Sequence, residues 1–273
     1  MSETPSYLTE LLLQLHGIDI SKYEDSFLHN ALLKGASESR CATVEEYGEL
    51  LRAQRPAADR FLQYLNIHYS EFMRNALTFA ALEGIVLPSL IAKIKSGNRK
   101  ELRIWCAACA AGQEAYSLAM LLEERRVSDP DAPSYRIFAT DQSETEIQEA
   151  LQGRYPATGI QNVSMRRVAA WFTEQGGVYT VREELRANIQ FSVFDLFSEQ
   201  SRFPPESIYG DFDLVLCANL LYYYKPEYRQ VILDKARSAI ARGGYLVTGE
   251  TEREILLQNT HVEVIPQSAI FRV

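Results

Sequence analysis

The sequence of 273 residues predicts an α/β protein in two parts, a small all-helical N-terminal domain (residues 1–78) and a larger domain of alternating strands and helices (residues 79–273). Two observations predict this division. Apolar residues recur at helical spacing through the first hundred residues, whereas short apolar runs separated by helical stretches follow from Glu101 onward. Strands alternating with helices indicate a mainly parallel sheet covered on both faces.

The N-terminal part carries several signals for helix ends. Tyr7–Leu15 is apolar at helical spacing and stops at Gly17, which suits the left-handed conformation that follows many helices. Thr43 and Glu46 have the spacing of a capping box. Pro56 stands where a first-turn proline is favoured. These signals predict separate short helices.

A longer helical run is expected over residues 78–95, with Pro88 as a kink or break. No stretch approaches the roughly 20 apolar residues that cross a bilayer, and the first residues lack the pattern of a signal peptide. We therefore expect no direct membrane insertion. The density of cysteines is too low for a secreted disulfide scaffold, so we expect reduced thiols and a cytoplasmic location. The cysteines are Cys41, Cys106, Cys109 and Cys217.

In the second part, the pattern predicts five strands and a small antiparallel β insert at about residues 154–187, where Gln175-Gly176-Gly177 marks a turn. A closing hairpin is expected from Val262–Ile265 and Ala269–Val273. The net charge of −8 argues against a general nucleic-acid binder, which would be basic. The expected strands are Leu102–Cys106, Tyr135–Thr140, Ile189–Phe194, Phe212–Cys217 and Gly244–Thr248.

Polar or small residues follow four of these strands, at the edge where open α/β sheets bind ligands. Cys106–Glu114 joins a strand to a helix almost entirely through small side chains, including Ala108, and lacks the glycines and lysine of phosphate-binding loops. A ligand without phosphates, such as S-adenosylmethionine, fits this loop. Glu114 could accept a hydrogen bond from its ammonium group, or could simply favour the helix dipole.

The next two strands end in acidic residues. Asp141 could accept hydrogen bonds from ribose hydroxyls, or could cap the helix that begins near Ser143. Asp195 and Leu196 could contact an adenine edge, or could form a simple turn.

After the fourth of these strands, Ala218, Asn219 and three tyrosines, Tyr222–Tyr224, could line the floor of an active site, although at least two tyrosines are expected to pack as loop aromatics. Cys106 and Cys109 have Cys-x-x-Cys spacing without a second pair, so we expect small-residue packing rather than a metal site.

Taken together, these segments resemble the bacterial chemotaxis-receptor glutamate O-methyltransferases of the CheR type. The resemblance runs from about Tyr69 to the C-terminus and implies a Rossmann-like methyltransferase domain that uses S-adenosylmethionine and yields S-adenosylhomocysteine. It also implies a protein substrate, the cytoplasmic helical domain of membrane chemoreceptors. The strongest matches are Trp105–Ser117, Phe138–Ser143, Ala150–Tyr155 and Phe212–Tyr224.

The resemblance also assigns roles by position. Ser70 and Arg74 resemble an element that reaches the cofactor site, with Arg74 shaping the acceptor pocket and Tyr223 orienting the incoming carboxylate. No general base is required, because glutamate is already ionised near neutral pH and alignment alone can lower a barrier. The cofactor-binding residues implied are Ser70, Arg74, Ala108, Glu114, Asp141, Asp195, Leu196, Ala218 and Asn219.

Three departures from the family pattern concern the substrate more than the cofactor. Ala218 stands where an arginine is usual, Met73 replaces a phenylalanine, and His68 replaces an asparagine. Two alternatives therefore stay open, a methyltransferase with another acceptor and a non-catalytic sensor that binds S-adenosylmethionine.

Overall fold

The computed structural model describes residues 4–65, 70–97, 99–258 and 262–273. The chain forms two compact units, one from Met1–Ile67 with Leu220–Gln230 and the other from His68–Asn219 with Val231–Val273. Compactness thus assigns Leu220–Gln230 to the helical unit, although these residues lie far along the sequence. We describe each unit by itself.

The N-terminal segment of the first unit forms four α-helices within the described residues, and three of them carry end signals that the sequence predicted. Gly17 adopts the left-handed conformation (φ 68°) after the first helix. The Thr43 hydroxyl accepts the backbone N–H of Glu46 at 3.1 Å, and the Glu46 carboxylate accepts the N–H of Ala42, one residue before the cap, at 2.6 Å. Pro56 is the second residue of the fourth helix. The helices are α1 (Thr4–His16), α2 (Asp25–Glu38), α3 (Val44–Ala53) and α4 (Arg55–Leu65).

The second unit opens with a helical run from Ala76 to Ser96 that does not break at Pro88. It consists of α5 (Ala76–Ala81), a π-helical turn η1 (Leu82–Val86) and α6 (Leu87–Ser96). Pro88 lies in the first turn of α6, where its missing N–H is tolerated because the π-helical turn before it already changes the hydrogen-bond register.

By length and hydropathy this run could cross a membrane, so the expectation that no stretch approaches a membrane span is wrong. Packing in the protein core also accounts for the apolar residues of this run. Leu82, Val86, Leu87, Leu90 and Ile94 are buried in the main core of the unit, which explains a hydrophobic helix without a bilayer.

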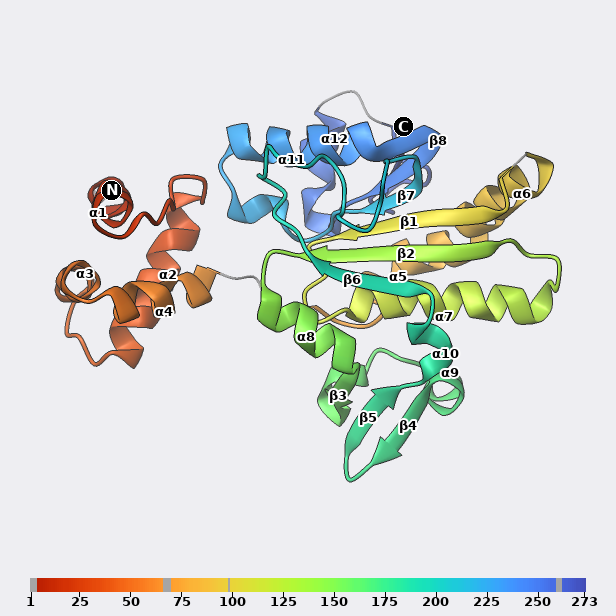
Figure 1. Cartoon of the computed structure of the whole chain (residues 1–273), viewed down its shortest axis with the longest axis horizontal. Coiled ribbons are helices and arrows are strands. Elements are labelled where there is room, and N and C mark those ends of the chain that lie inside the picture. The colour runs from red at the N-terminus through yellow and green to blue at the C-terminus, as the bar shows by residue number, and fades with distance from the viewer. Residues whose placement is uncertain (1–3, 66–69, 98, 259–261) are drawn as a thin grey trace. The chain divides into compact units, whose positions relative to one another are not determined.

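The unit is built on a six-stranded sheet in the order β6-β2-β1-β7-β8-β9 (Figure 1). Neighbouring strands are parallel except for β9, which is antiparallel to β8. The strands are β1 (Glu101–Ala107), β2 (Ser134–Asp141), β6 (Ile189–Val193), β7 (Phe212–Leu216), β8 (Ile240–Val247) and β9 (Ile270–Arg272). The principal helices are α7 (Gln113–Ser128), α8 (Glu144–Gln152) and α12 (Arg253–Leu257), together with the part of α11 (Pro226–Ala239) that follows Gln230. The α/β prediction is confirmed.

Strand β1 is buried on both faces, as a central parallel strand should be. Leu102, Ile104 and Cys106 point into the main core. Trp105 points to the opposite face, where its ring packs 5.7 Å from that of Phe212. Side chains of β1 thus alternate between two packed faces, and this packing fixes the position of the strand and of its carboxyl end.

The expected antiparallel insert is present as a three-stranded sheet in the order β3-β5-β4 (Figure 1). Gly176 and Gly177, both at positive φ, form the two-residue turn between β4 and β5. The strands are β3 (Arg154–Pro156), β4 (Phe172–Gln175) and β5 (Val178–Val181), accompanied by η2 (Ala157–Ile160), α9 (Met165–Trp171) and α10 (Glu183–Arg186).

The C-terminal tail turns back on itself, but only its second limb forms a strand. Phe271 bridges Glu263 on one side, while β9 pairs with β8 on the other. The expected two-stranded hairpin is therefore reduced to one isolated bridge, and β9 also joins the edge of the large sheet.

Candidate functional site

The carboxyl ends of β6, β2, β1 and β7 lie along one edge of the sheet, because these four strands are adjacent and parallel. The four loops singled out in the sequence follow these ends (Figure 1). Ligands of open α/β sheets bind at this edge.

The loop after β1 has an unusual backbone. Ala108 (φ 58°), Ala110 (φ 46°) and Gly112 (φ 89°) all adopt left-handed conformations, which cost free energy for alanine. Cys109 donates its N–H to the Thr140 carbonyl at 2.9 Å and so ties the loop to β2. A Cβ on Gly112 would lie 3.0 Å from the Cβ of Ala150. The loop is thus strained and closely packed, with small side chains as predicted.

Asp141 ends β2 and fixes this loop. Its Oδ2 accepts the N–H of Ala110 at 2.9 Å, and its Oδ1 accepts the N–H of Ser143 at 2.9 Å. The cap of α8 is Ser143, whose hydroxyl accepts from Glu146, so the alternative that Asp141 caps this helix is wrong. Each carboxylate oxygen has more than one lone pair, so Asp141 can still accept a ligand hydroxyl.

Glu114 lies in the first turn of α7 and is only 8% exposed. Burial raises the pKa of its carboxyl from 4.5 to about 7, the Arg74 guanidinium opposes this rise, and the charge of Glu252 adds to it. Burial raises the pKa of the Cys106 thiol and Glu114 adds to that rise, whereas for the Cys217 thiol burial is followed by Glu252 and then by Glu114. A helix-dipole role alone does not explain such a buried acid.

Arg74 belongs to a segment, Ser70–Asn75, that is anchored to the rest of the unit. Met73 (φ 51°) donates its N–H to the Ser117 hydroxyl of α7 at 3.0 Å. The fully buried Phe72 ring packs edge-on against Tyr155 at 4.8 Å. Ser70 is half-buried at the start of the segment. These anchors hold Arg74 within electrostatic range of Glu114.

Asp195 and Leu196 follow β6. Asp195 is exposed, and its Oδ1 accepts the N–H of Phe197 at 2.9 Å, which is the simple-turn geometry. Leu196 is buried at 7% exposure. Between the strands, Phe194 donates its N–H to the Asp141 carbonyl at 2.9 Å. The turn therefore follows a residue bonded directly to Asp141.

Asn219, in the loop after β7, is held by a residue that the sequence analysis missed. Asn219 is left-handed (φ 60°) and donates its N–H to Oε2 of Glu252 at 2.7 Å. Glu252 is fully buried in η4 (Glu250–Glu252), after β8. Ala218 is buried at 8% exposure. The only sequence signal for Glu252 was its place in an acid-rich turn behind a strand.

Tyr223 belongs to the first compact unit, within η3 (Leu221–Tyr223). Its carbonyl accepts the N–H of Glu24 at 2.9 Å, and its ring packs edge-on against Phe27 at 4.8 Å. Tyr224 stacks on Tyr23 at 5.1 Å. The expectation that at least two of the three tyrosines pack as aromatics is confirmed.

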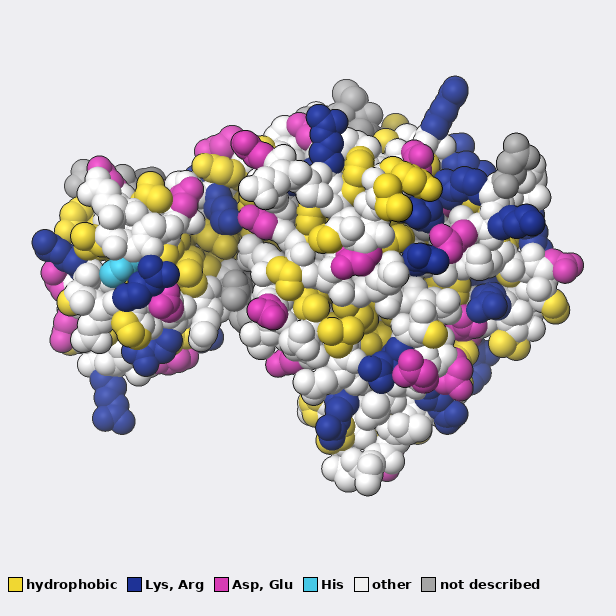
Figure 2. All heavy atoms as spheres, in the orientation of Figure 1, with side chains coloured by type: hydrophobic (Ala, Val, Ile, Leu, Met, Phe, Trp, Pro, Cys, Tyr) yellow, Lys and Arg dark blue, Asp and Glu magenta, His cyan; other side chains and the backbone are white. Residues whose placement is uncertain are grey.

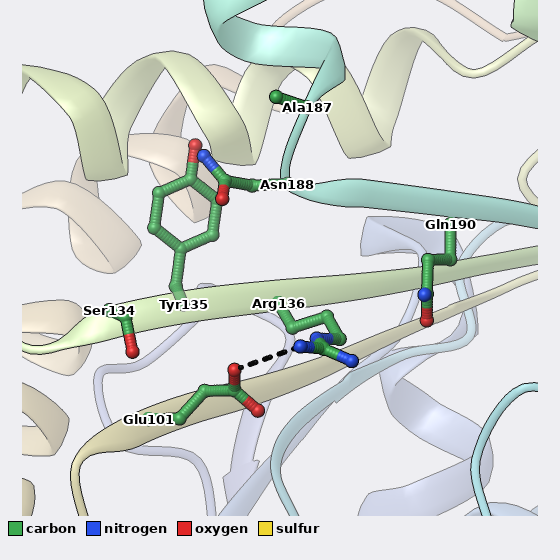
Figure 3. Close-up of a pocket in the computed structure, with 7 residues that line it drawn as sticks. All are labelled: Glu101, Ser134, Tyr135, Arg136, Ala187, Asn188 and Gln190. Carbon is green, nitrogen blue, oxygen red and sulfur yellow. Dashed lines mark ion pairs between the residues drawn. The ribbon is translucent and has the colours of Figure 1, made fainter.

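Cys106 and Cys109 are free and buried, and no group of three potential metal-ligating side chains occurs within the described residues. A pocket does occur at the opposite edge of the sheet, where β1, β2 and β6 begin (Figure 3). It is lined by Tyr135, Asn188 and Gln190, and by the Arg136–Glu101 ion pair at 3.5 Å. Its place at the amino ends sets it apart from the candidate site.

The residues at the carboxyl edge fit a cationic nucleoside. Glu114 and Asp141 supply acidic acceptors for an ammonium group and hydroxyls, and the buried Oε1 of Gln113 has no hydrogen-bond donor among the described residues. The loop Ala108–Gly112 offers backbone without side-chain bulk. This set suits the ammonium, ribose and sulfonium of S-adenosylmethionine.

Comparison with known proteins gives the class first. Residues 68–271 match the family model described as CheR methyltransferase, SAM binding domain, so this protein is an S-adenosylmethionine-dependent methyltransferase. The chain belongs to the CheR methyltransferase family.

Relatives extend the match to the N-terminal region. A chemotaxis protein methyltransferase of Listeria monocytogenes is 30% identical over 247 residues, 90% of this chain and 88% of that protein. The chemotaxis protein methyltransferase Cher2 of Pseudomonas putida is 30% identical over 242 residues, 86% of this chain and 85% of that protein. An uncharacterised 104.1 kDa protein of Rhodobacter capsulatus is also 30% identical over 258 residues, but this chain spans only 26% of it.

Proposed function

We propose that this protein transfers the methyl group of S-adenosylmethionine to glutamate side-chain carboxylates of a protein, the cytoplasmic helical domain of chemoreceptors. The products are glutamate methyl esters and S-adenosylhomocysteine. The observation that carries the proposal is the buried Glu114, within electrostatic range of Arg74, at the carboxyl edge of the sheet in a chain of the CheR family. A cytoplasmic location follows from such a substrate.

The donor site is formed by the loops after the four strands. Glu114 accepts a hydrogen bond from the ammonium group, and Asp141 accepts from the ribose hydroxyls. Asp195 and Leu196 contact the adenine. The backbone of Ala108, the Ser70–Arg74 segment and the Ala218–Asn219 pair complete the enclosure. The bound donor supplies an electrophilic sulfonium methyl.

The acceptor side is assigned to Arg74 and Tyr223. A guanidinium attracts and orients a carboxylate through charge-assisted hydrogen bonds, and a phenol can donate one more. Because the glutamate carboxylate is ionised near neutral pH, no side chain needs to remove a proton. The residues contribute alignment of the acceptor oxygen with the methyl group and exclusion of water, which can supply roughly 7–11 kcal/mol.

The distribution of surface charge bears on where an acidic protein substrate could bind. On the face shown in Figure 2, Lys and Arg side chains are interspersed with Asp and Glu. A receptor helix that is rich in acidic residues would bind best to a locally basic surface on the methyltransferase. Arg52, Arg55 and Arg60 of the helical unit remain candidates, although Arg52 and Arg55 form ion pairs with Glu49 and Asp59.

The test combines the purified full-length chain, S-adenosylmethionine labelled in its methyl group, and a cytoplasmic receptor fragment. Base treatment of the quenched protein fraction should release labelled methanol, which identifies a carboxyl methyl ester. Tyr223→Phe should slow the transfer while the chain still binds the donor, whereas Arg74→Ala should slow the transfer and also weaken donor binding. If calorimetry shows donor binding but no labelled ester forms on the receptor, the receptor assignment is wrong.

A further inference from the structure

Glu252 is a buried acid that the assigned roles leave unused. It is fully buried, and its Oε2 accepts two backbone N–H groups, that of Gly249 at 2.8 Å and that of Asn219 at 2.7 Å. One carboxylate oxygen therefore connects the loop after β7 to the loop after β8. Hydrogen bonds to an ionised carboxylate are stronger than neutral ones, and they favour its charged form.

The space around this connection is filled. A Cβ on Gly249 would lie 2.8 Å from Oε2 of Glu252 and 2.9 Å from the backbone nitrogen of Asn219. Gly249 itself has φ −66°, which any residue can adopt. Glycine is thus required here by the close approach of two backbones, and not by its conformation. Asn219, in contrast, is held in the left-handed region.

The charge of Glu252 also acts on Glu114. The titratable groups that interact electrostatically with Glu114 come from five segments around the site. Arg74 lies in the segment before α5, Cys106 in β1, Cys109 in the loop after β1, Cys217 after β7, and Glu252 in η4. Arg74 favours the ionised form of Glu114, whereas Glu252 disfavours it. Within a buried site such charges interact strongly because water screens them poorly.

We propose that Glu252 is a positioning residue of the cofactor site. Its Oε2 accepts one backbone N–H from Asn219 and one from Gly249, and so holds Asn219 against the turn after β8, while its charge sets how readily Glu114 accepts the donor's ammonium group. The second half of this inference rests on the proposed function, because it assumes that Glu114 binds the ammonium. The first half stands on the geometry of Asn219, Gly249 and Glu252 alone.

The charge can be separated from the hydrogen bonds. Glu252→Gln keeps an oxygen acceptor for the two N–H groups but removes the charge. Glu250→Gln, at an exposed residue of the same turn, is the matched control. Binding of S-adenosylmethionine to each full-length chain is measured by calorimetry from pH 5.5 to 8.5, and each affinity profile is scaled to its own maximum.

For Glu252→Gln, the pH of half-maximal affinity should fall by about half a unit or more, because Glu114 ionises more easily without a neighbouring negative charge. For Glu250→Gln it should not move. An unchanged profile for a folded Glu252→Gln protein overturns the electrostatic role, since a purely structural residue would leave the profile in place.

Gly249→Ala tests the hydrogen-bonded half and does not depend on the folding of the first variant. The added Cβ should push Asn219 away from Glu252 and weaken donor binding by about tenfold or more at every pH. A folded Gly249→Ala protein with unchanged affinity overturns the positioning of Asn219. The proposed function fails differently, because in that case the unmodified chain binds the donor and no receptor is methylated.

Discussion

The carboxylate of Asp141 accepts the backbone N–H of Ala110 at 2.9 Å, and this bond holds a left-handed alanine in the loop after β1. The residues are 31 apart in the sequence. The end of one strand thus fixes the loop that follows its neighbour. Because the same carboxylate is our candidate ribose acceptor, loop conformation and ligand binding depend on one side chain.

Replacing Asp141 by alanine should lower the free energy of unfolding by about 2–4 kcal/mol, since two hydrogen bonds to a charged acceptor are lost and the Ala110 N–H is left buried. Urea denaturation of the full-length chain measures this. Asp195→Ala is the control, because Asp195 is exposed and its carboxylate accepts the N–H of Phe197 in a surface turn, so its loss should cost less than about 1 kcal/mol. Equal losses in both variants would contradict the assigned role of Asp141.

Gly112→Ala should destabilise the protein by about 1–3 kcal/mol and weaken donor binding. Gly112 has φ 89°, and its added Cβ would meet Ala150 at 3.0 Å and Phe191 at 3.1 Å. Gly48→Ala offers the opposite case, because Gly48 lies inside α3 with nothing within 4 Å of a Cβ. In Gly48→Ala the higher helix propensity of alanine should raise the free energy of unfolding by about 0.5–1 kcal/mol. Thermal and urea unfolding of both variants compare the two directions.

The pH dependence of stability should carry the signature of Glu114. Its pKa is raised from 4.5 to about 7 in the folded chain, so the folded state binds the proton more tightly. This contribution is neutral below pH 4.5, and it destabilises increasingly as the pH rises to about 7, by an order-of-magnitude total of 3 kcal/mol. Glu114→Gln should remove this loss, so its stability relative to the unmodified chain should increase from pH 4.5 to pH 8. A constant difference between the two proteins across this range would refute the assignment.

Donor binding should release a proton near pH 6.5. At that pH much of Glu114 is protonated, because its pKa is about 7. An ammonium group placed beside it favours the ionised form. Calorimetry in buffers of different ionisation enthalpy should show release of a substantial fraction of one proton for the unmodified chain and almost none for Glu114→Gln. Similar proton release from both proteins would place the ammonium group elsewhere.

The sequence by itself determined the elements and much of the site. Hydrophobic periodicity and helix-end signals located the strands, most helices and the small insert, because these depend on residues close together in the chain. The run of small residues before Glu114 and the acid at the end of β2 predicted a candidate ligand edge, since parallel neighbours necessarily bring their carboxyl ends together. The proposed roles of individual residues and the domain boundary at residue 78 stay predictions.

Only the tertiary structure decided how distant segments combine. The sequence did not reveal that Glu252 holds Asn219, which lies 33 residues away, or that Leu220–Gln230 packs with the helical unit. Nor did it foresee that the apolar Ala76–Ser96 run serves the protein core. Such contacts arise when a buried charge must find donors and an apolar face must find a partner. Both depend on the folded arrangement, and local residue patterns carry no record of it.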